Sequence, residues 1–329
     1  MAIQCFILFL SILIDRLFGD PALLWRIIPH PVVWFGWGIK FADKTLNRTE
    51  WSDRTRLWLG WMTIIVLLAI AGFLGGIIHI ILFSFGWSGI IIEAIFASIF
   101  IAQKSLAQHV RAVFDAFTLN GLVGARKAVS MIVGRDPETL NESTVASSAI
   151  ESLAENTSDG IVAPVFWFFI LGLPGLLAYK MLNTADSMIG HLNLQYRDFG
   201  YATAKLDDVA NFIPARLTAF MVLFLLWLKL SNESCQKYWH MIKIDAPHHR
   251  SPNAGWPEAA FAHALNICLS GPRSYQGKIS QEPYLNEKGK QACVTDIPQA
   301  LKLFYNIMNL LLILVGFLVG YSLFFFIKR

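Results

Sequence analysis

The chain has 329 residues, of which 55% are hydrophobic and only 15% are charged, and its formal net charge is +4. Soluble domains carry about 25% charged residues, so this composition excludes an ordinary soluble protein and favours a membrane protein. The small and dispersed positive charge excludes nucleic acid as a partner. The four cysteines form no CxxC pair, so they predict neither a zinc site nor a disulfide framework.

Long apolar runs predict transmembrane helices. No Asp, Glu, Lys or Arg occurs between Leu57 and Phe85 or between Leu303 and Ile327, and about 18 apolar residues suffice to span a bilayer. We therefore expect an all-α, polytopic integral membrane helical bundle with about 5–6 membrane segments, cytoplasmic-facing polar helices and one membrane-embedded domain over residues 1–329. The apolar segments are approximately 2–18, 57–85, 88–103, 161–181, 212–230 and 303–327.

Two of these segments depart from a simple span. The segment 88–103 is short and contains Glu93, and we expect it to continue as one long helix to about Phe117. The segment 161–181 contains Leu171-Gly-Leu-Pro-Gly175. Glycine and proline inside an apolar run favour a kink or two half-helices, so this segment is a candidate re-entrant hairpin.

Basic residues predict the orientation. Segments 19–56, 104–160 and 231–302 hold most of the Lys and Arg residues, so the positive-inside rule places them in the cytoplasm of a bacterial-type inner (plasma) membrane. Six full crossings would then leave the polar segment 182–211 outside. A re-entrant 161–181 returns it to the cytoplasmic face, but a second segment must then also fail to cross. Both topologies stay open, and we expect a multi-pass protein with a cytoplasmic active face.

The clearest candidate site is an acidic stripe on a predicted helix. Asp136 is the expected N-cap of this helix, and Gly160 is its expected stop. Between them Glu151, Glu155 and Asp159 recur at steps of four on one face, where like charges repel and invite a compensating cation. Mg²⁺ prefers one or two carboxylates together with substrate phosphates. The alternative is an ordinary solvated acidic face.

A second candidate group stands at the end of an apolar segment. Lys180, Asn183 and Asp186 follow one another at steps of three. A lysine can extend its charged end to the membrane surface, but Asn183 and Asp186 are too short to do so. Polar groups at membrane depth are costly and often functional, and the alternative is a plain interfacial helix end.

A third candidate group surrounds the start of the fifth apolar run. Asp208 and Asn211 precede the run, and Arg216 lies inside it. An arginine in that position is expected to pair with a carboxylate or with an anionic ligand. The first of these pairings would be structural and the second functional, and the sequence leaves both open.

The fourth candidate group is a proline-marked loop. It carries His249, Arg250, Ser251 and Asn253, which can present hydrogen-bond donors to a phosphate or carboxylate, although a plain surface loop is the alternative. The histidines have no partner at zinc-ligand spacing. The sequence contains no GxxxxGK[ST], GxGxxG or GxSxG motif, so a bound nucleotide would need a non-standard cradle.

Together these stretches resemble the CobD/CbiB membrane family of cobalamin biosynthesis, adenosylcobinamide-phosphate synthase, over nearly the whole chain. Several long motifs occur in the right order. They are Asp15-Arg-Leu-Phe-Gly-Asp-Pro21, Pro29-His-Pro31, Gly134-Arg-Asp136, Glu151-Ser-Leu-Ala-Glu-Asn156, Asp159-Gly160, Ala163-Pro164, Tyr179-Lys180, Asn183-Thr184, Asp186-Ser-Met188, Asp207-Asp208, Asn211, Pro214-Ala-Arg-Leu217 and Ser251-Pro-Asn-Ala-Gly255.

The resemblance implies an acid–amine ligase that uses ATP and Mg²⁺. A propionate of adenosylcobyric acid, a corrinoid, would be joined to (R)-1-aminopropan-2-ol or its O-phosphate. By analogy, Glu151, Glu155 and Asp159 would bind the metal, and the catalytic residues would be Glu155, Asp159, Asp186 and Asp208. The substrate-binding residues would be Lys180, Asn183, Asn211, Arg216, His249, Arg250, Ser251 and Asn253.

Two other functions remain open. The resemblance extends to a branch linked to cell-wall-stress signalling, so a non-enzymatic membrane sensor is the first alternative. A transporter is the second, but the charges cluster near segment ends and no matched pair of broken helices is evident. Rescue of cobalamin synthesis in a deletion strain would separate the enzyme from both. The expected partners are the substrates, the lipid bilayer, and either a second copy of the chain or other membrane enzymes of the cobalamin pathway.

Overall fold

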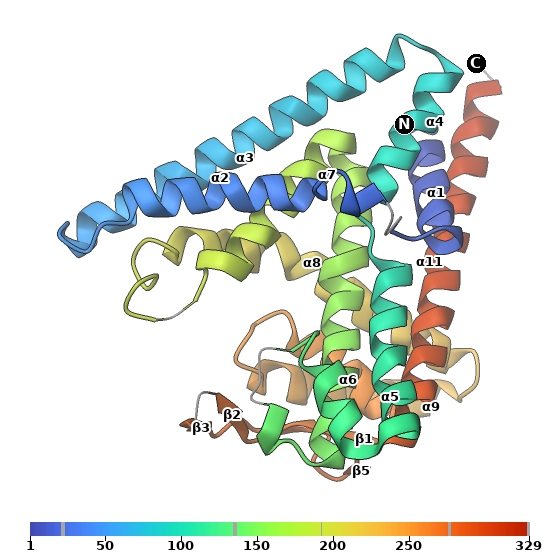
Figure 1. The fold of residues 1–329 in the computed structure, drawn as a ribbon. Coiled ribbons are helices and arrows are strands. Elements are labelled where there is room, and N and C mark those ends of the chain that lie inside the picture. The colour runs from blue at the N-terminus through green and yellow to red at the C-terminus, as the bar shows by residue number, and fades with distance from the viewer. Residues whose placement is uncertain (21–23, 134–136, 192, 276–277, 328–329) are drawn as a thin grey trace. The chain divides into compact units, whose positions relative to one another are not determined.

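A computed structural model describes residues 1–20, 24–133, 137–191, 193–275 and 278–327. This part of the chain is mostly helical, as predicted, with a few very short strands (Figure 1). The chain divides into two compact units, and each unit combines segments that are far apart in the sequence. Unit 1 comprises Met1–Ile101, Ala163–Asn211 and Val315–Arg329, and unit 2 comprises Ala102–Val162 and Phe212–Leu314. The expectation of one domain over residues 1–329 stays a prediction.

Unit 1 is built mainly from five helices. Helix α3 packs along α7, α1 packs against α4, and α2 contacts both α3 and α7. Apolar side chains such as Leu8, Ile64 and Phe168 are almost completely buried in these contacts. The helix bounds are α1 Ala2–Leu17, α2 Pro31–Leu46, α3 Asp53–Phe83, α4 Trp87–Ser98 and α7 Ala163–Ile189, and a short 3-10 turn spans Leu24–Arg26.

Helix α7 reverses direction at Gly172, which adopts φ 66° and ψ −153°. A Cβ atom placed on Gly175 would lie 2.5 Å from the carbonyl oxygen of Trp167, whereas residues eight positions apart in one straight helix are separated by about 12 Å. The arm before Gly172 therefore folds back on the arm after it. The predicted break is confirmed, and its geometry is the one that a re-entrant segment requires.

The end of the first arm of α7 is stabilised by a side chain from α1. Gln4 donates from Nε2 to the carbonyl oxygens of Phe168 and Phe169, at 2.8 and 3.1 Å. The last carbonyl groups of a helix have no partner within the helix, so these two bonds replace the ones that the reversal interrupts. Pro174 stands in the first turn of the second arm, where a missing N–H is tolerated.

The same reversal occurs at two other pairs of glycines. Gly121, inside α5 (Gln103–Val129), has φ 61° and ψ −155°, and a Cβ on Gly124 would lie 2.8 Å from the carbonyl oxygen of the residue eight positions earlier. Gly86 has φ 63° at the turn from α3 to α4, and Gly89 abuts a carbonyl group of α3. The first glycine of each pair is needed because it adopts a positive φ. The second is needed because there is no room for a Cβ atom next to the facing carbonyl group.

The acidic helix differs from the prediction at both ends. Helix α6 spans Glu142–Thr157, and its N-cap is Asn141, whose side chain accepts a backbone hydrogen bond. Asp136, the expected N-cap, lies outside the described residues. The expected stop at Gly160 is wrong, because Ser158–Val162 form a π-helical turn that leads directly into α7. Gly160 does not adopt the left-handed conformation that ends many helices.

The single long helix expected from residue 88 to Phe117 is also wrong. Its first part is α4, which ends at Ser98, and α5 begins at Gln103. In the short break, the N–H groups of Phe100 and Ile101 donate to carbonyl groups only three residues earlier. This tighter hydrogen-bonding pattern is typical of a helix end.

In unit 2, α6 packs against α5 and α10. Ala149, Ile150 and Leu153 form an apolar face of α6 that is completely buried. Most of the alanine-rich α10, which ends at Leu265, is also buried. The other helical bounds are α9 Asn232–Asp245 and α10 Gly255–Leu265, with 3-10 turns at Pro137–Thr139, Ala246–His248 and Val294–Asp296.

Short strands follow α10 and were not predicted. Strand β1 pairs antiparallel with β4 and parallel with β5, while β2 and β3 form a separate antiparallel pair. Each strand has two to four residues. Their bounds are β1 Ile267–Ser270, β2 Arg273–Tyr275, β3 Lys278–Ser280, β4 Tyr284–Leu285 and β5 Lys290–Gln291. Two further helices, α8 Tyr201–Trp227 and α11 Ile297–Ile327, contribute residues to both units.

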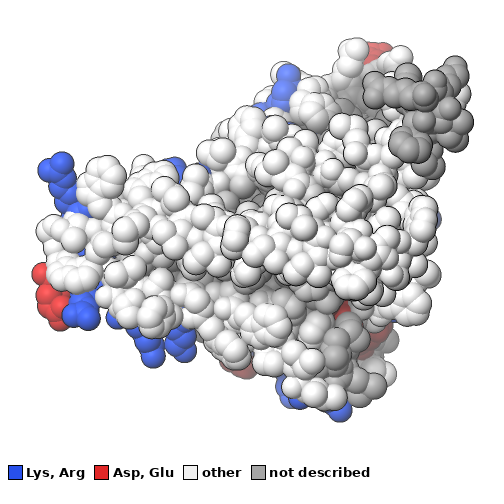
Figure 2. Space-filling model, turned by 90° about the horizontal axis from the view of Figure 1, so that it is seen from above, with Lys and Arg blue, Asp and Glu red and all other residues white. Residues whose placement is uncertain are grey.

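Five helical segments in the described chain are long and apolar enough to cross a membrane. Many large apolar side chains of α3 are exposed, including Phe73 and Ile80 at 69% each, as expected for contact with lipid rather than water. The face in Figure 2 is mostly free of charged side chains, which lie mainly along its edges. The candidate spans are Asp53–Phe83, Trp87–Val129, Glu142–Ile189, Tyr201–Trp227 and Val294–Ser322.

Candidate functional site

The acidic stripe of unit 2 lies on α6 and on the π-helical turn that follows it. Glu151 is only 4% exposed, Glu155 is exposed, and Asp159 is half-buried on the π-helical turn. The three carboxylates therefore follow one another along the helix but do not share one environment. Short π-helical turns are rare and often occur at functional sites, so this junction supports a role for Glu155 and Asp159.

Glu151 connects α6 to strand β1. Its Oε1 accepts a hydrogen bond from the backbone N–H of Ser270 at 2.7 Å. Ser270 ends β1 with φ 62°, a left-handed conformation that is uncommon for a residue other than glycine. A buried carboxylate that binds a backbone amide can hold such a conformation in place, so Glu151 has a structural task in addition to the predicted metal role.

The carboxylates suit a metal site that water and substrate complete better than a site made entirely of protein ligands. No group of three or more His, Cys, Asp and Glu side chains in the described ranges is arranged to hold a metal ion. Mg²⁺ does not require such a group, because it commonly takes one or two carboxylates, several waters and substrate phosphates. Glu155 and Asp159 can supply the two carboxylates, and substrate phosphates would complete the site.

The loop His249–Asn253, here called the Ser-Pro-Asn loop, is held by its own side chains. Ser251 Oγ accepts hydrogen bonds from the backbone N–H groups of Asn253 and Ala254 at 3.3 and 3.2 Å. His249 Nδ1 accepts from the N–H of Ser251 at 3.1 Å. In a neutral imidazole the proton then resides on Nε2, which lies 3.5 Å from Oε1 of the buried Glu258.

Arg216 on α8 contacts the same loop. Its guanidinium carbon lies 3.5 Å from the ring centroid of Phe212 and 4.7 Å from that of Trp256. Its NH1 donates to the carbonyl oxygen of Phe212 at 2.8 Å and to Oδ1 of Asn253 at 3.3 Å. Aromatic faces stabilise a cation, so these contacts of Arg216 are with rings and uncharged oxygens rather than with a carboxylate, which was one of the two expected partners.

Arg250 points away from the buried part of the loop. Its side chain is 62% exposed, and NH1 lies 3.8 Å from Oε1 of Glu282. A side chain that is mostly exposed can be reached from solvent, and a guanidinium binds phosphate and carboxylate groups well. Arg250 is therefore the arginine of this loop that is best placed to meet a phosphate or carboxylate from solvent.

In unit 1, the second arm of α7 and the first part of α8 bring the second and third candidate groups together. The hydroxyl of Tyr179 donates to Oδ1 of Asn211 at 2.8 Å. The amide of Asn211 in turn donates to Oδ2 of Asp207 at 2.9 Å. Tyr179 and Asn211 are only 3% and 1% exposed, so this chain of hydrogen bonds cross-links the two helices inside the protein.

Two carboxylates lie on the two helices of this pair. The negative charge of Asp208 acts on Asp186, and His191 opposes that effect. Lys205 lies 3.5 Å from Oδ2 of Asp208. Asp186 and Asp208 are both half-buried, as are Lys180 and Asn183 on the same arm. Neighbouring carboxylates favour the approach of a cationic group.

His30 is a candidate that sequence reasoning left without a role. Its Nδ1 accepts a hydrogen bond from the N–H of Val32 at 3.2 Å and so caps α2, and its Nε2 lies 3.9 Å from Asp20. Burial lowers the pKa of His30, Asp20 and the Ile99 backbone oppose this effect, and the charge of Lys180 adds to it. Because the charge of Lys180 acts on His30, His30 is grouped here with the polar residues of unit 1. Its placement in the Pro29-His-Pro31 motif was the available signal.

The structure divides the predicted site residues between the two units. Two of the motifs lie partly or wholly outside the described residues: the motif that ends at Pro21, and the motif Gly134-Arg-Asp136. Unit 1 holds Lys180, Asn183, Asp186, Asp208 and Asn211, here called the helix-pair cluster. Unit 2 holds Glu151, Glu155, Asp159, Arg216, His249, Arg250, Ser251 and Asn253.

The chain is similar to proteins named for cobalamin biosynthesis. Residues 8–304 match the family described as CobD/Cbib protein. A cobalamin biosynthesis protein CobD from Brucella suis is 50% identical over 323 residues, covering 97% of this chain and 99% of the relative. One from a Sinorhizobium species is 46% identical over 318 residues, covering 96% and 98%.

The similarity also extends to a more distant relative. The cobalamin biosynthesis protein CobD of Rhodobacter capsulatus is 42% identical over 308 residues, covering 92% of this chain and 93% of the relative. No solved structure matches the chain. The family match and the relatives cover nearly the whole sequence, including the helix-pair cluster and the site residues of unit 2. The chain therefore belongs to the CobD/Cbib family of cobalamin biosynthesis proteins.

Proposed function

We propose that the protein is an acid–amine ligase that joins the propionate carboxylate of adenosylcobyric acid to (R)-1-aminopropan-2-ol or to its O-phosphate. Membership of the family over residues 8–304 is the observation that carries this proposal. The helix-pair cluster and the site residues of unit 2 support this proposal. An amide ligase must hold anionic substrates, and it must also remove a proton from an ammonium group. Both kinds of side chain are present on the described helices and loops.

The reaction needs activation of the carboxylate. A free carboxylate and an amine do not condense readily in water, so a phosphoryl group is first transferred from ATP to the carboxylate, giving an acyl phosphate and ADP. The amine then attacks the acyl carbon, and the amide forms as inorganic phosphate leaves. Such a sequence depends mainly on positioning and on charge neutralisation.

The helix-pair cluster suits the amine step. Asp186 on α7 and Asp208 on α8 influence each other electrostatically, so they can attract the ammonium form of the amine and accept a proton from it. Lys180 and Asn183 lie on the same arm of α7 and can bind an anionic or hydroxyl group of the substrate.

The unit 2 residues suit the binding of phosphates. Glu155 and Asp159 would hold Mg²⁺, which neutralises phosphate charge when it is bound. Arg250 is accessible to an anion, and the Ser-Pro-Asn loop offers a preorganised backbone next to it. Arg216 and Glu151 have a different task in this scheme, because their contacts hold the loop and strand β1 in place.

A direct assay tests the proposal. Detergent-purified protein is incubated with adenosylcobyric acid, Mg-ATP and aminopropanol, with and without its phosphate, and the corrinoid mass is followed by mass spectrometry. We expect an ATP-dependent mass gain equal to the amine minus water, with release of inorganic phosphate. Reactions without ATP or without amine serve as controls.

The opposite result would favour another role. A well-folded preparation that gives no mass gain with either amine contradicts the ligase proposal. Rescue of cobalamin synthesis in a deletion strain then separates the remaining explanations. Failure of rescue would support the sensor function, whereas rescue without activity in vitro would point to a required partner subunit.

A further inference from the structure

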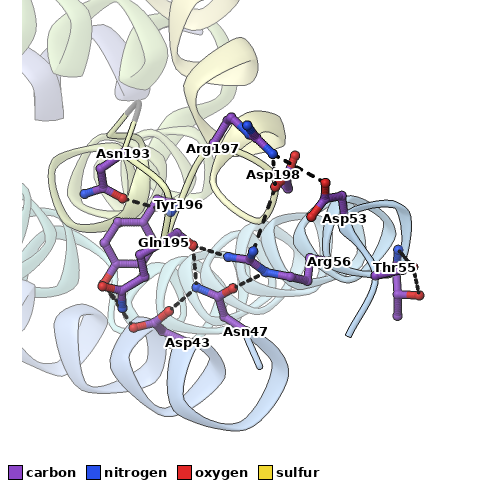
Figure 3. A network of polar contacts seen from close by, with 11 residues as sticks. Asp43, Asn47, Asp53, Thr55, Arg56, Asn193, Gln195, Tyr196, Arg197 and Asp198 are labelled. Atoms are coloured by element: carbon purple, nitrogen blue, oxygen red, sulfur yellow. Dashed lines mark hydrogen bonds and ion pairs between the residues drawn. The ribbon is translucent and has the colours of Figure 1, made fainter. Parts of the chain in front are cut away.

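The segment 190–200, which joins α7 to α8, is fastened to the hairpin formed by α2 and α3. Figure 3 shows a polar network in which side chains from both helices surround this segment. All of its members belong to unit 1. The segment is short and connects the helix that carries Asp186 with the helix that carries Asp208, so whatever fixes it also limits the movement of both helix ends.

Arg56 is the centre of this network. It lies in the first turn of α3, and its side chain is only 7% exposed. Nε donates to Oδ1 of Asn47 at 3.0 Å, and NH2 donates to the carbonyl oxygen of Gln195. NH1 lies 3.8 Å from Oδ2 of Asp198. The planar guanidinium thus binds three groups in fixed directions, two of them in the connecting segment.

A second set of contacts supports the same segment. Asn47 donates from Nδ2 to Oδ1 of Asp43 at 2.9 Å and to the carbonyl oxygen of Gln195 at 3.2 Å. The hydroxyl of Tyr196 donates to Oδ2 of Asp43 at 3.2 Å. Burial, and then the nearby Asp43 carboxylate, raise the pKa of Tyr196, so the phenol keeps the proton that it donates.

Close glycine contacts leave the segment little freedom. A Cβ on Gly60 of α3 would collide with the carbonyl oxygen of Phe199, and a Cβ on Gly200 would collide with that of Ile189. At the other end, a Cβ on Gly190 would collide with the carboxylate of Asp186 itself. The connecting segment therefore contacts the hairpin on one side and Asp186 on the other.

We propose that Arg56 is a positioning residue, which holds residues 193–200 of the connecting segment on the α2–α3 hairpin and so limits the movement of the helix ends that carry Asp186 and Asp208. The proposal rests on the proposed function in assigning the amine step to these two carboxylates. Arg56 touches neither substrate nor reacting atoms in this scheme. It acts through the connecting segment and through the contact between Gly190 and Asp186.

The first test measures geometry without activity. Spin labels are placed at Ser187→Cys and Tyr201→Cys in a background without the native Cys5, Cys235, Cys268 and Cys293, and their distance distribution is measured by pulsed electron resonance. We expect one narrow distribution in the parent and a clearly broader one with Arg56→Ala. Arg197→Ala is the matched control, because Arg197 is 56% exposed and binds Asp53 and Asp198 at the surface of the same segment.

The second test measures kinetics. Arg56→Ala should lower kcat by about 10- to 100-fold, because a displacement of about 1 Å at a reacting group can cost that much. KM for the corrinoid should stay within about threefold, since substrate binding is not the step affected. Arg56→Lys keeps the charge but not the fork of donors, and it should recover only part of kcat.

The outcomes separate this proposal from the proposed function. An unchanged distance distribution in Arg56→Ala, or an equal effect of Arg197→Ala, overturns the positioning role. No product from the parent enzyme, together with a broadened distribution, removes the ligase proposal and leaves Arg56 as the residue that orders the segment. Should Arg56→Ala fail to insert, Asn47→Ala removes only one anchor of Arg56 and gives the same test.

Discussion

The helix-pair cluster of unit 1 and the Ser-Pro-Asn loop of unit 2 contain similar polar residues but are held in different ways. In the loop, His249, Ser251 and Asn253 bond to one another, to Arg216 and to the backbone, and the histidine and asparagine are buried. In the cluster, the half-buried Asp186 lies within the electrostatic influence of Asp208, which itself pairs with Lys205. The bonds within the loop support its structure, whereas the charges of the cluster make it the better candidate for the proposed reaction.

Removal of the carboxylate proposed for the metal should have the largest effect. Glu155→Gln keeps the size of the exposed side chain but removes its charge, and we expect product formation to be abolished while membrane insertion is unchanged. Removal of Mg²⁺ with EDTA should likewise stop the parent enzyme. Glu142→Gln, in the first turn of the same helix, is the control and should retain activity. Full activity of Glu155→Gln would exclude the metal role.

The next largest effect is expected in the helix-pair cluster. Asp186→Asn removes a proton acceptor, so kcat should fall by about 10²- to 10⁴-fold with little change in thermal stability. Asp53→Asn applies the same change to a carboxylate that is 69% exposed at the start of α3, and it should be nearly neutral. Equal losses in the two variants would show that the cluster has no special part in the reaction.

Substitutions in the Ser-Pro-Asn loop should lower the stability of the protein rather than its catalytic rate. Asn253 is 4% exposed and accepts a hydrogen bond from Arg216. Asn253→Ala should lower the free energy of unfolding by about 1–3 kcal/mol, because the half-buried Arg216 loses one of its acceptors and the loop loses a buried polar side chain. Thermal unfolding in detergent measures this change. Asn232→Ala, at an exposed position of unit 2, should shift stability by no more than about 0.5 kcal/mol.

The smallest expected effect is on the pH dependence of protein stability. Burial lowers the pKa of His30 below its ordinary value of 6.5, so the unfolded chain binds a proton more readily than the folded one. Stability therefore falls as the pH drops through 6.5 toward the lower folded-state pKa. His30→Asn keeps a helix-capping side chain without this titration, and it should reduce the loss of stability on the acid side. An unchanged slope of stability against pH in His30→Asn would contradict this account.

Hydrophobicity and local spacing predicted most of the fold. The apolar runs became helices, and the break at residues 171–175 was found where glycine and proline interrupt an apolar run. Helix ends were harder to predict. The stop at Gly160 failed because glycine permits a helix end but does not impose one, and the chain continued through a π-helical turn.

Long-range contacts explain what the sequence did not reveal. The strands are too short to show an alternating pattern, and β1 pairs with residues about 20 positions away, which local propensity does not encode. The site residues stay predictions, and the contact of Glu151 with Ser270 and the stacking of Arg216 on aromatic rings depend on packing that the sequence does not show. The contacts of Arg56 were missed for the same reason, since it precedes an apolar run and resembles an interfacial charge.

The paired glycines at 172 and 175 also affect how the sequence is counted. The arm 163–171 has nine residues and is about 13.5 Å long, less than half of a bilayer core about 30 Å thick, and it continues from α6 through the π-helical turn. A hydropathy profile gives this apolar run one crossing, although the chain turns back on itself within it. An error of one crossing reverses the expected sidedness of every later segment. The topology of this chain thus depends on the odd or even number of complete passages, which a G-x-x-G reversal changes without altering the number of apolar runs.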